Sequence, residues 1–267
     1  MRRIIMPLLV ASMIAGCAGS KGPNERTLRD AAAENANSSD SLQPKVDYNK
    51  AARLYIELGL AYLKDGQVGR AKVKLLRAKK LAPQLPEVYY ALGFYMESVG
   101  EFDQAKQYYL TAIQRNPKDG KARNNYGTFL CRQGQYLESE KEFIAAIDDP
   151  NYTQTAEALE NAGFCMKEVP DLVKAKQYFE HAVRMDPRRV NALLELSYMN
   201  YQAAEYGAAS EHLSQYNLEA NQTPRSLWLA IKLAQRVNDH NKAGSLTMSL
   251  KQQFPNSQEM KDIQQGA

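Results

Sequence analysis

Cysteine and histidine, two residue types that often bind metals or catalyse reactions, are scarce in this chain of 267 residues. It has three cysteines and three histidines, and His181, His212 and His240 have no second ligand at metal-binding spacing. It also lacks a glycine-rich phosphate loop and the Gly-x-Ser-x-Gly sequence of α/β-hydrolases. These absences argue against an enzyme, and we expect no catalytic residue, metal, cofactor or small-molecule substrate.

An excess of charge of one sign is also missing. The chain has 34 Lys and Arg residues against 30 Asp and Glu residues, which gives a net charge of +4. This near-neutral balance argues against a nucleic-acid partner, because such partners need a strongly basic surface. No Lys/Arg run indicates a polybasic membrane patch either.

The apolar run over residues 4–14 is too short to span a bilayer as a helix. Two arginines precede this run, and its last residue begins the sequence Ile-Ala-Gly-Cys, which ends at Cys17. This order of charge, apolar run and small residues indicates a secretory signal. These four residues resemble a lipobox, in which the cysteine is acylated. We therefore predict that residues 1–16 are removed and that Cys17 carries a covalent lipid. The alternative is an ordinary cleaved signal with an incidental cysteine.

Residues 17–47 are expected to form the lipidated N-terminus and a flexible tether. The sequence Lys-Gly-Pro-Asn at 21–24 breaks regular structure, and residues 35–41 are small and polar. A flexible chain of this length spans about 30 Å root-mean-square, which keeps a folded body near a membrane. Ala18 resembles the outer-membrane sorting signal of Gram-negative lipoproteins. We therefore expect a lipid-anchored protein on the periplasmic face of the outer membrane.

A period of 34 residues runs through the rest of the chain. Gly59, Gly93 and Gly127 are spaced 34 apart, Gly163 follows after 36, and Ser197 after another 34. A fixed period in this range indicates stacked supersecondary units. No segment alternates apolar and polar residues over a useful length, so no β-strand is expected.

The periods contain the residue types that two packed helices need, although the sixth follows the pattern only weakly. With position 1 at Ala52, small residues recur at positions 8, 20 and 27, and large apolar residues at positions 4, 7, 11 and 24. A proline near position 32 ends the second helix. The pattern resembles the tetratricopeptide repeat, which implies an all-α, right-handed superhelical α-solenoid of six repeats and about twelve helices. The six units begin at Ala52, Pro86, Gly120, Ala156, Val190 and Pro224.

The repeats also predict the domain organisation. The six-repeat domain covers residues 48–257, and residues 258–267 are expected to be a polar, frayed C-terminal tail. Two extra residues interrupt the period between the third and fourth units, around residues 148–153. We expect a longer connection there, one that extends the following helix.

Cys131 and Cys165 are the two cysteines left if Cys17 carries lipid. They occupy position 12 of the third unit and position 10 of the fourth, both on first helices that lie side by side in the expected stack. An offset of two residues is a rotation of about 200°, which suits helices that meet through opposite faces. Because the periplasm is oxidising, we predict a disulfide. The alternative is a pair of small buried apolar residues.

First helices line the concave side of tetratricopeptide arrays, and positions 2, 5, 9, 12 and 13 usually face it. Here they include apolar residues such as Ile56 and Leu60, whereas arrays that grip C-terminal carboxylates have Lys and Asn at such places. We expect a groove for an extended or helical protein segment, although Leu63 and Phe164 have an alternative role in packing between repeats. The candidate groove residues are Ile56, Leu60, Leu63, Tyr90, Phe94, Asn124, Phe164 and Tyr198.

Four stretches carry a narrower resemblance. YIELGLAYL at 55–63 and NNYGTFLC at 124–131 resemble the type IV pilus pilotin lipoproteins (PilF/PilW type), and RSLWLAIKL at 225–233 with FPNS at 254–257 resembles their last unit. The lipobox, the six units and the insertion agree. This resemblance implies a protein that helps the pilus secretin subunit reach the outer membrane and form its ring, which supports twitching motility. We expect Ile56, Leu60, Tyr90 and Phe94 to capture the secretin.

Two other functions fit the same residues. One is a generic periplasmic scaffold lipoprotein for envelope or peptidoglycan machinery, and the other is a lipid-carrying or adaptor role for the apolar groove. Loss of the gene separates them. Monomeric or mislocalised secretin with normal bulk barrel proteins indicates a pilotin, whereas normal secretin rings with an envelope defect indicate a scaffold.

Overall fold

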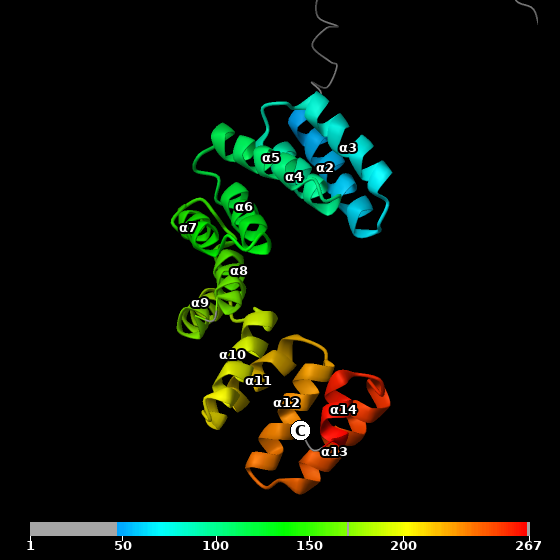
Figure 1. Cartoon of the computed structure of the whole chain (residues 1–267), viewed down its shortest axis with the longest axis vertical. Helices are drawn as coiled ribbons and strands as arrows, with labels where there is room; N and C mark the ends of the chain where they lie inside the picture. Colours follow the sequence, from blue (N-terminus) through cyan, green and yellow to red (C-terminus); the bar gives the residue numbers. More distant parts are fainter. Residues whose placement is uncertain (1–46, 170, 266–267) are drawn as a thin grey trace, which may run out of the picture. The chain divides into compact units, whose positions relative to one another are not determined.

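The computed structural model describes residues 47–169 and 171–265, and every regular element in this part of the chain is an α-helix (Figure 1). The predicted signal peptide, Cys17 and nearly all of the tether lie outside the described residues. The helices are α2 (Tyr48–Lys64), α3 (Val68–Leu81), α4 (Pro86–Ser98), α5 (Phe102–Arg115), α6 (Gly120–Arg132), α7 (Tyr136–Ile147), α8 (Thr155–Glu168), α9 (Leu172–Met185), α10 (Val190–Gln202), α11 (Tyr206–Glu219), α12 (Pro224–Arg236), α13 (His240–Gln253) and α14 (Gln258–Gln264).

Six helix–turn–helix pairs follow one another along the chain, from α2/α3 to α12/α13 (Figure 1). The two helices of a pair pack together, and the second helix of a pair contacts the first helix of the next. First helices also contact each other from pair to pair. Contacts between neighbouring units are the defining feature of a repeat solenoid. The predicted all-α solenoid of six repeats is confirmed.

A small residue at position 8 lets the two helices of a pair approach closely. A Cβ on Gly163 in α8 would lie 2.7 Å from the ring of Phe179 in α9, well inside the ordinary contact distance of about 3.5–4 Å. Ser197 holds this position in α10 and is fully buried. Its hydroxyl donates a hydrogen bond of 2.6 Å to the Ala209 carbonyl oxygen in α11. The serine therefore joins its two helices by a hydrogen bond.

The turns inside five of the six pairs repeat one backbone conformation. At position 15 of the first three repeats, Gly66, Gly100 and Gly134 have φ angles of 72°, 81° and 73°. Ala204 and Asn238 hold the same position in the fifth and sixth repeats, with φ angles of 61° and 57°. The turn geometry is therefore kept even where the residue has a Cβ, for which the left-handed conformation is energetically unfavourable.

The insertion between the third and fourth repeats forms a fixed connection over residues 148–154. The Asp149 carboxylate accepts a hydrogen bond of 3.1 Å from the Gly120 N–H at the start of α6. Tyr152 is buried, and a Cβ on Gly120 would lie 2.6 Å from its side chain. The longer connection that the sequence predicts is present, and it packs onto the first turn of α6.

The expectation of a frayed C-terminal tail is wrong for residues 258–264. They form α14, whose N-terminus is capped by the Ser257 side chain accepting a hydrogen bond from the Met260 N–H at 3.2 Å. Met260 is buried with Leu227 and Ile231 of α12 and Leu250 of α13. Ile263, three residues further along α14, packs against the same cluster, so these two apolar side chains dock the helix on the last pair.

Cys131 of α6 and Cys165 of α8 form a disulfide, with their Cα atoms 5.7 Å apart. It joins the first helices of the third and fourth repeats, which is the pairing that the spacing of the cysteines predicts. The buried Ser139 hydroxyl lies 3.3 Å from the Cys165 Sγ atom and donates a hydrogen bond of 2.7 Å to the Gly127 carbonyl oxygen. The disulfide therefore lies in the packed interior between two repeats.

Two buried glutamates join the later repeats. Glu160 of α8 pairs with Arg189 and accepts a hydrogen bond of 3.0 Å from the Ala192 N–H in α10. Glu195 of α10 pairs with Lys167 of α8 and Arg225 of α12. Burial would raise the pKa of Glu195, but the hydrogen bonds from Arg225 and Lys167 outweigh it and leave the pKa below its usual range. The charged form of Glu195 thus holds three successive first helices.

Candidate functional site

Four of the predicted groove residues line one hollow, which we call the N-terminal groove. Ile56 and Leu60 come from α2, Tyr90 and Phe94 come from α4, and the hollow has a volume of about 440 Å³. Within each helix the two residues are four apart, so they share one face. All of the lining residues belong to the first helices α2, α4 and α6. They are Arg53, Ile56, Glu57, Leu60, Glu87, Tyr90, Ala91, Phe94, Lys121 and Asn125.

The floor of the N-terminal groove is apolar and firmly packed. Ile56 is 5% exposed and Tyr90 is 7% exposed, so both contribute to the core while showing an edge to the groove. Phe94 is 43% exposed and presents its ring to solvent. An exposed aromatic ring beside a rigid apolar floor is the kind of anchor that protein interfaces use.

The rim of the N-terminal groove carries charges of both signs. The Arg53 guanidinium of α2 lies 3.1 Å from the Glu87 carboxylate of α4, and the Lys121 ammonium of α6 lies 5.6 Å from the centre of the Tyr90 ring. Burial raises the pKa of the Tyr90 hydroxyl, and the nearby Glu87 raises it further, so the phenol stays protonated at neutral pH. The rim can therefore form ion pairs and hydrogen bonds with a polypeptide laid across three helices.

The other four predicted groove residues lie away from this hollow. Leu63 is half-buried against the core of the first pairs, and Phe164 packs edge-on against a ring of α9, with centres 5.1 Å apart. Asn124 is buried, and its side-chain oxygen accepts a hydrogen bond of 3.1 Å from α8. Tyr198 lines a separate hollow between α9 and α10. For Leu63 and Phe164 the structure agrees with the alternative role of packing between repeats.

The charged rim residues were missing from the candidate set, although the sequence holds a signal for them. Arg53, Glu87 and Lys121 all occupy position 2 of their repeats. Position 2 was among those expected to face the groove, but the candidate groove residues were mostly apolar or aromatic and included none from this position. Ala91 and Asn125, which also line the hollow, share position 6. Repeat position is therefore a better guide to the lining than hydrophobicity.

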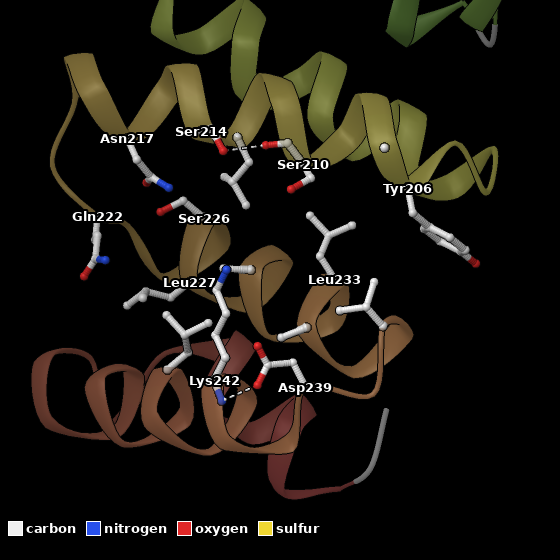
Figure 2. A pocket seen from close by; sticks show the side chains of 16 residues that line it. Tyr206, Ser210, Ser214, Asn217, Gln222, Ser226, Leu227, Leu233, Asp239 and Lys242 are labelled. Atoms are coloured by element: carbon white, nitrogen blue, oxygen red, sulfur yellow. Dashed lines mark hydrogen bonds between the residues drawn. The ribbon is translucent and has the colours of Figure 1, made fainter.

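A second cavity, of about 320 Å³, lies between α11, α12 and α13 (Figure 2). Leu227 and Leu233 contribute to an apolar wall, while Ser210, Asn217 and Gln222 stand at its edge (Figure 2). The buried side-chain atoms without a hydrogen-bond partner in the described part of the chain belong to residues outside this lining. Among the described residues that line the cavity there is therefore no buried polar atom left unpaired that would select a ligand.

The described residues give no indication of catalytic chemistry. Within 47–169 and 171–265 there is no cluster of three or more His, Cys, Asp or Glu side chains placed to hold a metal ion. In the same part of the chain, no helix has both the length and the apolar character to cross a bilayer. What these residues do provide is surfaces for contact with other molecules.

Sequence comparisons place these observations in a family. Models of the tetratricopeptide repeat match residues 86–119 and 108–141. The type IV pilus assembly protein PilF from Pseudomonas aeruginosa is 30% identical over 216 residues, which cover 81% of this chain and 86% of PilF. An uncharacterized protein from Haemophilus influenzae is 30% identical over 144 residues, which cover 54% of this chain and 80% of that protein.

Solved structures agree with the sequence comparison. The structure of Pseudomonas aeruginosa PilF matches with a TM-score of 0.73 at 29% identity, over 83% of this chain and 100% of that one. PilW, a widely conserved type IV pilus biogenesis factor, shares the fold with a TM-score of 0.67 at 24% identity, over 80% of this chain and 99% of its own. Because the identity to PilF extends over most of both chains, this chain belongs to the PilF family of type IV pilus assembly proteins.

Proposed function

We propose that this protein is an outer-membrane pilotin, anchored by a lipid on Cys17, that binds the secretin of the type IV pilus and promotes its localisation and multimerisation. The observation that carries the proposal is the N-terminal groove, in a chain of a type IV pilus assembly family. Its apolar floor and mixed-charge rim span three repeats. The protein acts by binding and catalyses no reaction.

The groove geometry favours a polypeptide ligand. Phe94 offers its exposed ring as an anchor, and the floor beside it is already ordered, so little conformational entropy is lost on binding. Arg53 and Glu87 at the rim can exchange their mutual ion pair for contacts with the ligand. An extended or helical segment of the secretin that places an apolar side chain next to Phe94 fits this arrangement.

A lipid anchor adds to this contact by confining both molecules to one surface. Secretin subunits held beside the outer membrane have a raised effective concentration, and ring assembly depends on concentration. The tether sequence, about 30 Å in root-mean-square length if flexible, keeps the groove within that layer. In this proposal the pilotin therefore supports assembly through location as well as through shielding of apolar surface.

The test is complementation of a strain that lacks the gene, with secretin multimers, twitching and co-purified secretin as readouts. Phe94→Asp should weaken secretin binding by roughly thirtyfold, since loss of an interface anchor costs about 2 kcal/mol. The matched control is Phe102→Asp, because Phe102 is 47% exposed on α5, outside the groove lining. It should leave all three readouts unchanged.

Cys17→Ser tests the anchor in the same strain. We expect this variant to leave the outer-membrane fraction while still co-purifying with secretin. Normal secretin rings in the deletion strain, accompanied by an envelope defect, would favour a general scaffold and reject the pilotin. Equal loss of binding with Phe94→Asp and Phe102→Asp would reject the groove as the binding surface.

A further inference from the structure

The first helix pair carries an unusual concentration of positive charge. Residues 48–82 contain nine Lys and Arg residues and two acidic residues, a net charge of +7, whereas the whole chain carries +4. The rest of the chain is therefore net acidic. α3 alone has six cations and no acidic residue, while no other helix in the described part has more than three cations.

The charge on α3 is organised as a stripe. Lys72, Val73, Leu76, Arg77 and Lys80 are all exposed, and their spacing of three and four residues places them on one face of the helix. Val73 is 64% exposed and Leu76 is 45% exposed, so two apolar side chains project to solvent among three cations. We call these five residues the basic stripe.

The cations of the basic stripe differ from the other cations of α3. Lys74 lies 5.8 Å from the ring centre of Tyr55, and Lys79 lies 5.2 Å from that of Tyr108, so both are held against the fold. Lys72, Arg77 and Lys80 form no ion pair within the described residues. Cations placed beside exposed apolar side chains and left without an acidic partner are available to an external ligand.

The position of the stripe on the chain points to a membrane. A hollow of about 380 Å³ lined by Arg77, Lys80 and Leu81 also includes Tyr48, the first residue of α2. The chain enters the repeat domain at Tyr48 from residues 1–46, which contain the candidate lipid site. The basic stripe therefore lies next to the point where a membrane tether joins the fold.

We propose that the basic stripe is a contact surface for anionic phospholipid headgroups. Lys and Arg side chains bind the phosphates, while Val73 and Leu76 enter the boundary between headgroups and acyl chains, as on interfacial amphipathic helices. Val73 and Leu76 project to solvent outside the hollow at Arg77 and Lys80, and projecting apolar side chains suit a flat lipid layer. The surface adds to the proposed anchor on Cys17 and does not depend on secretin binding.

The experiment uses the full chain with Val73→Cys labelled by a fluorophore and vesicles that carry a headgroup quencher. Vesicles of phosphatidylcholine alone are compared with vesicles that also contain phosphatidylglycerol, and quenching is titrated against lipid. The chain need not carry a lipid anchor in this assay. Binding to a vesicle brings the fluorophore close to the quencher, so quenching rises with vesicle concentration. The control probe is Ser245→Cys, which has the same repeat position in the sixth repeat. The unsubstituted chain gives the labelling background.

We expect quenching at position 73 that requires phosphatidylglycerol and is lost in high salt, with little quenching at position 245. Each cation near an anionic surface contributes about a fivefold preference, so Lys72→Glu with Lys80→Glu should reduce the response at position 73 to that of the control probe. Lys106→Glu with Lys251→Glu changes the net charge equally on other helices and should preserve it.

Three outcomes would overturn the proposal. The first is equal quenching at position 73 with and without the anionic lipid. The second is equal quenching at positions 73 and 245, which means general adsorption. The third is a Lys72→Glu, Lys80→Glu variant that keeps the vesicle response but loses secretin capture, which assigns the surface to an acidic protein segment. The Cys17→Ser variant should lose the lipid anchor but keep the dependence of quenching on phosphatidylglycerol. It therefore tests the anchor separately from the basic stripe.

Discussion

At the residue scale, the turns inside five of the helix pairs show how one backbone conformation constrains a sequence. Gly66, Gly100 and Gly134 adopt positive φ angles without steric cost, because glycine has no Cβ. Ala204 adopts a φ of 61° at the equivalent position, where its Cβ crowds the backbone. The fifth repeat therefore contains a local strain that the first three avoid.

Replacing Ala204 with glycine should stabilise the protein. The left-handed conformation costs alanine roughly 1–2 kcal/mol, and part of that gain is offset by the greater chain entropy of glycine when unfolded. We expect Ala204→Gly to raise the free energy of unfolding by about 1 kcal/mol in a urea titration. Ala203→Gly is the matched control, because Ala203 has a φ of −78° and should lose stability instead. A loss of stability in both variants would contradict the strain.

Single residues of the site could be predicted only in part from the sequence. Repeat positions brought Ile56, Leu60, Tyr90 and Phe94 to one hollow, because equivalent positions on stacked first helices face the same way. Position alone could not tell that Phe164 turns toward a ring of α9. That choice depends on side-chain packing between repeats, which the 34-residue period does not encode.

At the element scale, α10 is held by charge as well as by apolar packing. Its buried Glu195 pairs with Lys167 of α8 and Arg225 of α12, whose side chains are partly exposed. The charged form of Glu195 is stabilised in the fold, because its pKa lies below the usual range. Its stabilising effect is complete above the unfolded pKa of about 4.3 and is lost as pH falls through the lower folded pKa.

Glu195→Gln should therefore destabilise the protein most at neutral pH. Removing one partner of a fully buried ion pair costs about 3–5 kcal/mol, and because both cations here are partly exposed we expect about 2 kcal/mol at pH 7. The difference from the parent protein should shrink below about pH 4, as Glu195 itself becomes protonated. Chemical denaturation at a series of pH values from below 4 to 7 measures this difference in the free energy of unfolding. Glu211→Gln is the control, because Glu211 is exposed. A difference that stays constant with pH would contradict the charged pair.

The elements themselves were largely predictable, and the exceptions have clear causes. The 34-residue period predicted the six pairs, and a small residue at position 8 marks the first five of them. The helix α14 was missed because its docking depends on only two apolar side chains in a polar segment, the buried Met260 and the partly buried Ile263. The basic stripe does not stand out as a polybasic run, since the cations of α3 are interspersed with apolar residues. Only the helical period brings Lys72, Arg77 and Lys80 to one face.

At the scale of the whole molecule, stability spreads from neighbour to neighbour along the repeats. The disulfide between Cys131 and Cys165 joins the third and fourth repeats, where the insertion at 148–153 interrupts the period. Because the bridge closes a loop of 34 residues, the two halves of the array are covalently coupled at their least regular junction.

Replacing both cysteines with serine should lower the free energy of unfolding by about 3–4 kcal/mol in the chain-entropy description of a disulfide. Denaturant titration of Cys131→Ser with Cys165→Ser measures the loss, and reduction of the parent protein should reproduce it. Mass measurement after alkylation provides the check on the bond itself. Two thiols that react at these positions without prior reduction would contradict the disulfide.

The small helix α14 also makes the two ends of the array unlike. Met260 and its neighbours cover the apolar face of α12 and α13, whereas Leu58 in α2 is 39% exposed at the other end. An open-ended filament of identical subunits needs two complementary ends, and here one end is closed. The apolar face on which a further repeat would stack is therefore already occupied by α14.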